Sequence, residues 1–416
     1  MTAYRLARIA GPIALCLALD ARAADWPQFR GPTGQGQVAE TSIPLTWDEQ
    51  QGIAWRAPVE GLGWSSPVVV ADRIYLTSAV PQGDEAQLLV AECRALKDGS
   101  IVWRRELQQQ TGEVEMHKKN SHASPSPVVD GDRVYVHFGP HLTACLKISD
   151  GSTVWAKRLD YSPQHGTGGS PEVFEDLLIL CCDGRDVQYV VGLDTLSGNE
   201  RWRTSRETSP SKGFSFSTPL IIEAGGRTQA ICPGSEAVFA YDPRTGQEIW
   251  RCNYGDGYSV VPRPVYANGL VYICTGYNRP KLLAIDPTGV GDVSATHLKW
   301  EYDRSVPHNP SIAAVGDAVY FVSDKGVATC LDAVTGEERW QERLGGNFSA
   351  SPIATEDRVY FQDEAGVCHV VKAAAVYELL ATNNWAPGRR TYASFAVVDH
   401  GLLARSEDAI VLITGQ

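Results

Sequence analysis

One sequence unit returns along most of the chain, and it limits the fold more than any other feature does. The unit begins with a small polar residue followed by proline, runs through two apolar segments, and ends in Leu-Asp-x-x-Thr-Gly-x-x-x-Trp or a close variant. Its clearest copies end at Trp202, Trp250 and Trp340. A unit of this length cannot bury an apolar face alone, so several copies are expected to pack side by side.

The unit starts eight times, at Ser66, Ser126, Ser170, Thr218, Arg263, Asn309, Ser351 and Ser394. Only seven terminal aromatic residues follow these starts: Trp103, Trp155, Trp202, Trp250, Trp300, Trp340 and Tyr377. We place the eighth upstream, at Trp55, on a strand that pairs with the outer edge of the last unit. The sequence therefore predicts an all-β fold, an eight-bladed β-propeller with four-stranded blades, closed by an N-terminal strand that completes the last blade.

A small residue lies ten positions before most of the tryptophans. These residues are Cys93, Cys145, Gly192, Ala240 and Cys330. A wide indole needs such a slot to pack between blades, so the cysteines among them are interpreted as small apolar residues. Adjacent Cys181 and Cys182 leave two alternatives open, a vicinal disulfide or two small strand residues.

The first 23 residues are typical of a signal peptide. Arg5 and Arg8 precede an apolar run at 9–19, and the sequence Ala-Arg-Ala at 21–23 suits a cleavage site. The apolar run is shorter than a membrane span, although an uncleaved anchor is the alternative. We expect residues 1–23 to be a signal peptide, 24–52 an N-terminal extension and 53–416 the propeller, and the protein to be exported to the periplasm or the extracellular space.

Net charge and loop positions together suggest where a ligand binds. A formal net charge of −12 argues against nucleic-acid binding. In a propeller, the loops between blades share one face with the turns between the second and third strands. We call this the mouth face, because its loops surround one end of the central channel. The candidate ligand-binding residues there are His122, His165, Lys212, Tyr258, Arg263 and His308.

These side chains favour an anionic ligand at the mouth, while the alternative is that they only bind water and backbone in a polar channel. The three histidines lie on different repeats, and no His-Glu-x-x-His motif occurs. We therefore predict no metal site. The repeated Asp-x-x-Thr-Gly turns lie on the opposite face, where they are expected to be structural.

The repeat resembles the PQQ-type repeat of the quinoprotein alcohol dehydrogenase-like propellers, over residues 53–416. More narrowly, the chain is similar to secreted PQQ-like propellers of planctomycetes and related bacteria. The segments that carry this resemblance are Trp-Pro-Gln-Phe-Arg-Gly-Pro at 26–32, Lys-Asn-Ser-His-Ala-Ser-Pro at 119–125, His-Gly-Thr-Gly-Gly-Ser-Pro at 165–171 and Tyr-Ser-Val-Val-Pro-Arg-Pro at 258–264.

The resemblance implies PQQ with calcium as a cofactor if the protein is an enzyme. The dehydrogenases, however, are longer and carry insertions that cover the cofactor and supply calcium ligands and a catalytic aspartate. Here the blades are minimal, and no matching set of Glu, Asn and Asp is found, so we assign no catalytic residue. In several of these enzymes a vicinal disulfide lies over the cofactor. A disulfide between Cys181 and Cys182 would match that feature.

The sequence favours a non-catalytic, exported binding or scaffold module that takes a protein, a glycan or a small anion at the mouth face. One alternative is a PQQ-dependent oxidoreductase. Another is a scaffold for outer-membrane protein assembly, resembling the propeller lipoprotein of the barrel-assembly machinery, although no lipidation signal is found. No transmembrane segment is predicted beyond the signal region, and a monomer is expected.

Overall fold

The computed structural model describes residues 25–38, 43–83, 86–112, 115–206, 208 and 210–415. The predicted signal peptide at 1–23 lies outside these residues. The described residues form 33 β-strands. None of them belongs to a helix with the length and apolar character needed to cross a membrane.

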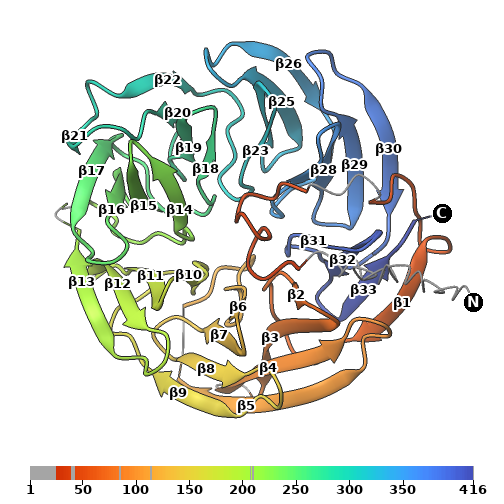
Figure 1. The fold of residues 1–416 in the computed structure, drawn as a ribbon. Helices are drawn as coiled ribbons and strands as arrows, with labels where there is room; N and C mark the ends of the chain where they lie inside the picture. The colour runs from red at the N-terminus through yellow and green to blue at the C-terminus, as the bar shows by residue number, and fades with distance from the viewer. Residues whose placement is uncertain are drawn as a thin grey trace, which may run out of the picture.

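Eight sheets form a closed ring, which confirms the eight-bladed β-propeller (Figure 1). Blade one contains β2 (Val68–Val70), β3 (Arg73–Pro81), β4 (Ala86–Ala95) and β5 (Ile101–Thr111). Blade two contains β6 (Val128–Asp130), β7 (Arg133–His137), β8 (Thr143–Lys147) and β9 (Thr153–Lys157). Blade three contains β10 (Glu172–Phe174), β11 (Leu177–Asp183), β12 (Gln188–Asp194) and β13 (Glu200–Ser205). Blade four contains β14 (Leu220–Ala224), β15 (Arg227–Pro233), β16 (Ala237–Tyr241) and β17 (Glu248–Asn253), and the short β21 (Gly291–Asp292) pairs parallel with β17 as a fifth strand.

The second half of the ring repeats this order. Blade five contains β18 (Val265–Ala267), β19 (Leu270–Cys274), β20 (Leu282–Ile285) and β22 (Leu298–Tyr302). Blade six contains β23 (Ala313–Val315), β24 (Ala318–Val322), β25 (Val327–Asp332) and β26 (Glu338–Arg343). Blade seven contains β27 (Ile353–Ala354), β28 (Arg358–Gln362), β29 (Val367–Lys372) and β30 (Leu379–Asn384). Blade eight contains β31 (Ala396–Val398), β32 (Gly401–Arg405), β33 (Ala409–Ile413) and β1 (Ile53–Pro58).

The N-terminal strand closes the ring as predicted. β1 pairs antiparallel with β33, and Trp55 lies opposite Leu412. The indole N–H of Trp55 donates to the carbonyl of Leu96 in blade one, at 2.9 Å. The two ends of the propeller are therefore joined by backbone pairing and by a side chain that reaches the next blade.

The small-residue slots also occur where the sequence places them. Cys93 lies opposite Trp103 on the neighbouring strand, Gly192 opposite Trp202, and Cys330 opposite Trp340. A Cβ added at Gly192 would lie 2.4 Å from the Trp202 ring. The indoles also pack on the turn glycine of the next blade, where a Cβ at Gly246 would lie 2.4 Å from Trp202. Each repeated Trp and Gly thus joins two blades.

Blade seven corrects one prediction. The place opposite Val370, where other blades carry Trp, holds Ala381, while Tyr377 lies in the preceding turn and packs on Trp340 of blade six at 5.2 Å between ring centroids. Trp47 from the extension takes the missing place, because it stacks on Tyr360 of blade seven with centroids 6.4 Å apart. The replacement comes from a distant part of the chain, so the repeat pattern could not reveal it.

The starts of the repeats form a hydrogen-bonded ring around the channel. The backbone N–H of Ser66 donates to the hydroxyl of Ser126 at 2.8 Å, and the same bond joins seven of the eight pairs of neighbouring blades. The step from Thr218 is missing because the next start, Arg263, has no hydroxyl. In blade six the start is Ser311 rather than Asn309, two residues later than predicted.

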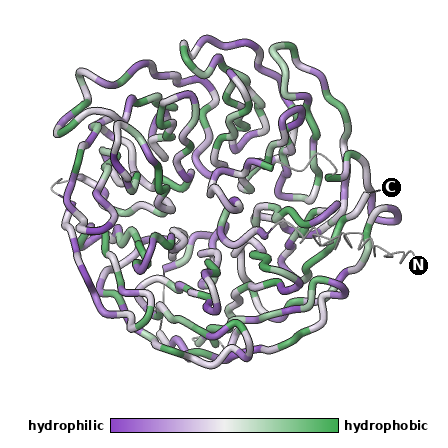
Figure 2. Tube along the Cα trace, in the orientation of Figure 1, coloured by the Kyte–Doolittle hydropathy of each residue, from purple (hydrophilic) through white to green (hydrophobic). Residues whose placement is uncertain are grey.

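Residues 25–38 form a plug segment inside this ring, drawn in red at the centre of Figure 1. The plug is bound to the innermost strands of several blades. Trp26 exchanges two backbone hydrogen bonds with Val69 of blade one, at 2.7 and 2.9 Å. Val38 donates to Ala354 of blade seven at 2.8 Å. The plug is mostly hydrophilic or neutral in colour, whereas apolar residues concentrate along the strands (Figure 2).

The apolar cores lie between neighbouring blades and separate the two adjacent cysteines. Cys182 belongs to the core between blades two and three, and Cys181 packs against the core between blades three and four. Successive residues of a strand point to opposite faces, which explains this separation. All nine cysteines of the described residues are free thiols, so the vicinal disulfide is absent from this structure.

Candidate functional site

A belt of aromatic and imidazole rings crosses the mouth face, and it contains three of the six candidate residues. We define the aromatic belt as His117, His165, Phe214, Tyr258, Tyr277 and His308. Neighbouring rings of the belt have centroids 5.4 to 5.9 Å apart. The members come from the loops that precede blades two to six and from one turn of blade five. The side-by-side packing of consecutive blades brings these loops together.

Charged side chains flank the belt. Nζ of Lys212 lies 3.0 Å from the hydroxyl of Tyr258 and 4.5 Å from the centre of its ring, a cation–π contact. Nδ1 of His165 lies 3.1 Å from Glu115, and Nδ1 of His308 lies 3.4 Å from Asp324. Burial raises the pKa of Asp324, but hydrogen bonds from His308 outweigh this effect and leave it below its ordinary value.

A polar pocket of about 290 Å³ adjoins the belt. We define it by its lining residues: Gln164, Arg185, Asp186, Gln188, Thr208, Pro210, Ser211, Lys212, Gly213 and Phe214. Lys212 and Phe214 connect the pocket to the belt: both line the pocket, Phe214 is a member of the belt, and Lys212 contacts Tyr258 of the belt. Asp186 already accepts hydrogen bonds from the amide and hydroxyl of Ser162, at 2.8 and 3.0 Å. Arg185 also lies 3.9 Å from Glu115, the carboxylate that contacts His165, so the cations Arg185 and Lys212 are opposed by two carboxylates that both have other contacts.

His122 lies apart from the belt. Its Nδ1 is bonded to the side-chain amide of Gln110, at 3.0 to 3.1 Å. Burial lowers the pKa of His122 below its ordinary value, so the imidazole is neutral at pH 7. A neutral imidazole that is already bonded is a poor ligand for an anion.

Arg263 corrects a second expectation, because its side chain lies in the channel rather than at the mouth. It pairs with Glu172 at 2.5 Å and donates to the carbonyls of Pro219 and Phe29 and to the side chain of Gln28. The guanidinium is fully enclosed, with 0% of the side chain exposed. Every donor nitrogen of Arg263 is thus used within the protein.

Sequence reasoning missed Phe214 and Glu115 and gave no special weight to Tyr277. Phe214 lies four residues before the start at Thr218, close to the position that His165 and Tyr258 hold before their own starts. That shared offset was a usable signal. Glu115 gave none, because its contact with His165 depends on how the loop before blade two folds over the mouth.

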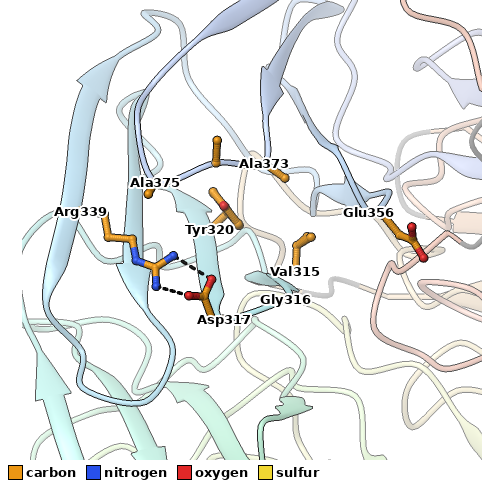
Figure 3. Close-up of a pocket in the computed structure, with 9 residues that line it drawn as sticks. Val315, Gly316, Asp317, Tyr320, Arg339, Glu356, Ala373 and Ala375 are labelled. Carbon is orange, nitrogen blue, oxygen red and sulfur yellow. Dashed lines mark hydrogen bonds and ion pairs between the residues drawn. The ribbon is translucent and has the colours of Figure 1, made fainter.

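The opposite face carries a larger pocket of about 680 Å³ between blades six and seven (Figure 3). Ala373, Ala374 and Ala375 line it where other blades have the Asp-x-x-Thr-Gly turn. Arg339 projects toward it but is bonded to Asp317 at 2.7 and 2.9 Å and to Asp332 at 2.8 Å. The pocket follows from the degenerate turn, and its cation is neutralised.

Comparison with known proteins places the chain in a family. Residues 89–300 and 289–375 match the family described as outer membrane protein assembly factor BamB. The chain belongs to this family. Among curated proteins, the serine/threonine-protein kinase AfsK of Streptomyces griseus is 30% identical over 148 residues, which are 33% of this chain and 16% of the kinase. The chain thus spans about a sixth of that relative.

Solved structures of this architecture show the same fold at low sequence identity. BamB from Moraxella catarrhalis has a TM-score of 0.59 and 16% identity, covering 86% of this chain and 97% of that one. The quinohemoprotein alcohol dehydrogenase ADHIIG from Pseudomonas putida HK5 has a TM-score of 0.65 and 13% identity, covering 94% and 81%. A europium-containing methanol dehydrogenase has a TM-score of 0.64 and 12% identity, covering 94% and 89%.

The fold shared with these dehydrogenases, together with the resemblance of the repeat, raises the question of whether PQQ with a metal ion suits the mouth of this chain. Calcium takes six to eight oxygen ligands. Among the described residues, no group of three or more His, Cys, Asp or Glu side chains is placed to hold a metal ion. Glu364, another carboxylate on the mouth face, is bonded to Lys119 at 2.5 Å and to Ser349 at 2.6 Å. These residues do not suit the metal-dependent cofactor, and we derive no reaction step from it.

Proposed function

We propose that this protein is an exported, non-catalytic binding module that takes its ligand on the mouth face, over the aromatic belt and the polar pocket. One observation carries the proposal. Loops from five blades, far apart in the sequence, supply a continuous series of rings beside a pocket with two cations. Binding sites in proteins combine apolar walls with a few well-placed polar groups in this way.

The side chains indicate the class of ligand. Tyr277 and Lys212 are exposed, and His165 is more than one-third exposed, so they can meet a ligand directly. Arg185 and Lys212 suit a carboxylate or sulfate. The side-chain carbonyl oxygens of Gln164 and Gln188 suit hydroxyl groups, since their NH2 groups are already bonded to Glu115 and to the carbonyl of Gly184. Aromatic rings such as that of Tyr277 pack against the apolar C–H face of a sugar ring. An acidic saccharide offers all three features, and we take it as the ligand class.

A matched pair of substitutions tests the proposal. Lys212→Ala removes a cation that lies over the Tyr258 ring at the mouth. Arg244→Ala removes a cation that lies 4.9 Å over the Phe174 ring on the opposite face. The probes are uronic-acid and sulfated oligosaccharides, with neutral oligosaccharides for comparison, measured by isothermal titration calorimetry on the exported chain.

We expect the acidic probes alone to bind. Lys212→Ala is expected to weaken their binding by about tenfold, or about 1.4 kcal/mol, because a charge-assisted contact is lost. Arg244→Ala is expected to leave binding unchanged. Equal binding of neutral probes, or a loss of binding with Arg244→Ala only, would contradict the proposal.

A second candidate function follows from the family match, which is described as an outer-membrane protein assembly factor. In that case the mouth face would bind a protein of the assembly machinery. Crosslinking from a photoreactive residue at position 277 distinguishes the two, since a scaffold would give a discrete protein adduct and a saccharide-binding module would give none.

A further inference from the structure

The plug brings two guanidinium groups into the closed centre of the propeller. Arg30 and Arg263 are each only 1% exposed. The carboxylate of Glu172 pairs with Arg263 at 2.5 Å. These three side chains therefore place a net charge of one positive unit in the channel. An isolated buried charge costs several kcal/mol unless it is paired.

Arg30 is only partly bonded, in contrast to Arg263. Its Nη2 donates to the carbonyls of Ile312, Gln35 and Pro352, at 2.6, 2.7 and 3.4 Å. Nε and Nη1 have no hydrogen-bond acceptor among the described residues. Burial, and next the charge of Arg263, lower the pKa of Arg30 to about 9. The group stays protonated at neutral pH, and its Nη1, which points away from Nε and the bonded Nη2, keeps both N–H groups without an acceptor among the described residues.

The plug is shaped to bring backbone close to both guanidinium groups. A Cβ at Gly34 would lie 2.5 Å from Cζ of Arg263, and a Cβ at Gly36 would lie 2.8 Å from Nη2 of Arg30. Both glycines have a positive φ, +68° and +73°. Side chains at these positions would displace the two arginines. The glycines therefore preserve the arrangement in which Nη1 of Arg30 has no acceptor among the described residues.

We propose that a small monovalent anion of the halide class binds the unpartnered Nη1 of Arg30 inside the channel. One negative charge balances the net charge of Arg30, Arg263 and Glu172. A small ion is required because Arg30 is almost fully enclosed. The anion helps to hold the plug against blades six and seven, where Nη2 of Arg30 already donates to the carbonyls of Ile312 and Pro352. This site is independent of the ligand proposed for the mouth face.

Bromide tests the site directly. Crystals of the exported wild-type chain are grown with bromide in place of chloride, and anomalous differences are recorded at the bromine edge. We expect a peak within hydrogen-bond distance of Arg30 Nη1. Bromide at the protein surface only, with no peak at Arg30, would overturn the proposal and leave water as the partner.

Thermal unfolding gives a second test. At constant ionic strength, replacing gluconate by chloride is expected to raise the Tm of the wild-type chain, because an ion that binds only the folded state stabilises it. Arg30→Met should abolish this dependence on chloride. Arg206→Met is the matched control, since Arg206 is equally buried but fully paired with Asp183 at 2.8 and 3.0 Å. Equal dependence on chloride in all three proteins would also overturn the proposal, and the bromide experiment remains decisive if Arg30→Met fails to fold.

Discussion

The two faces of the propeller use their loops differently. On the opposite face, Asp242 accepts hydrogen bonds from the amides of Arg244 and Thr245, at 2.9 and 3.0 Å, and Asp332 does the same in its own turn. On the mouth face each loop has its own length and sequence, and the loops converge on the aromatic belt. Repetition therefore marks residues that build the ring, whereas variation at equivalent places marks residues that remain free to bind.

The largest effect is expected where the ring is joined. Deleting residues 24–60 removes the plug, Trp47 and β1, and leaves the edge of β33 unpaired. We expect no folded monomer, as measured by size-exclusion chromatography and circular dichroism. A truncated chain that stays monomeric with the Tm of the full chain would contradict the closure.

The next largest loss of stability is expected when a side chain packed between two blades is removed. Trp250 is fully buried and donates to the side chain of Gln229 at 2.7 Å. Trp250→Ala is expected to cost about 3–5 kcal/mol in the free energy of unfolding, as for other buried aromatic truncations. Denaturant titration measures the cost, and Ile101→Ala, at a residue 53% exposed, is the control. A cost below about 1 kcal/mol would show that the seam between blades is not tightly packed.

The smallest loss of stability is expected when the aspartate of a single turn is replaced. Hydrogen bonds from the amide of Thr335, and next from Arg339, lower the pKa of Asp332 to about 2. A carboxyl group whose folded pKa is depressed stabilises the protein above its unfolded pKa, near 3.9, and loses this effect as pH falls through about 2. Asp332→Ala is expected to cost about 1 kcal/mol at pH 7, because hydrogen bonds of a mostly solvated turn are lost.

Unfolding at pH 7 and at pH 2 checks this prediction. The difference between wild type and Asp332→Ala should shrink at the lower pH, and oligosaccharide binding should be unchanged. Asp303→Ala, at an exposed residue outside the turns, serves as the control. A loss of ligand binding without a loss of stability would place function on the opposite face and remove the contrast between the two faces.

The repeat predicted the fold because each copy carries its own packing partners. Trp202 and Gly192 lie in the same blade, so their spacing contains the contact. The errors arise where a partner comes from elsewhere in the chain. Trp47 fills the place where blade seven lacks a tryptophan of its own. Ser311, rather than Asn309, continues the hydrogen-bonded ring of repeat starts.

The site could be predicted only in part for a related reason. His165, Tyr258 and His308 precede repeat starts, so topology alone brought them to one face. Arg263 holds the same kind of position, yet its long side chain turns into the channel toward Glu172. A position in the sequence places a backbone on a face, whereas the direction of a side chain depends on the partners it finds there.

The joining of β1 to β33 has a consequence for the order of folding. The plug also binds blades one and seven, so the segment from residue 25 to 58 completes its contacts only after the last blade exists. During synthesis this segment must therefore wait, unpaired, for the rest of the chain. Such pairing of distant segments slows folding and favours a late, cooperative final step. Blades one to seven can assemble in order, but the edge of β33 in blade eight is covered by β1 only at the end.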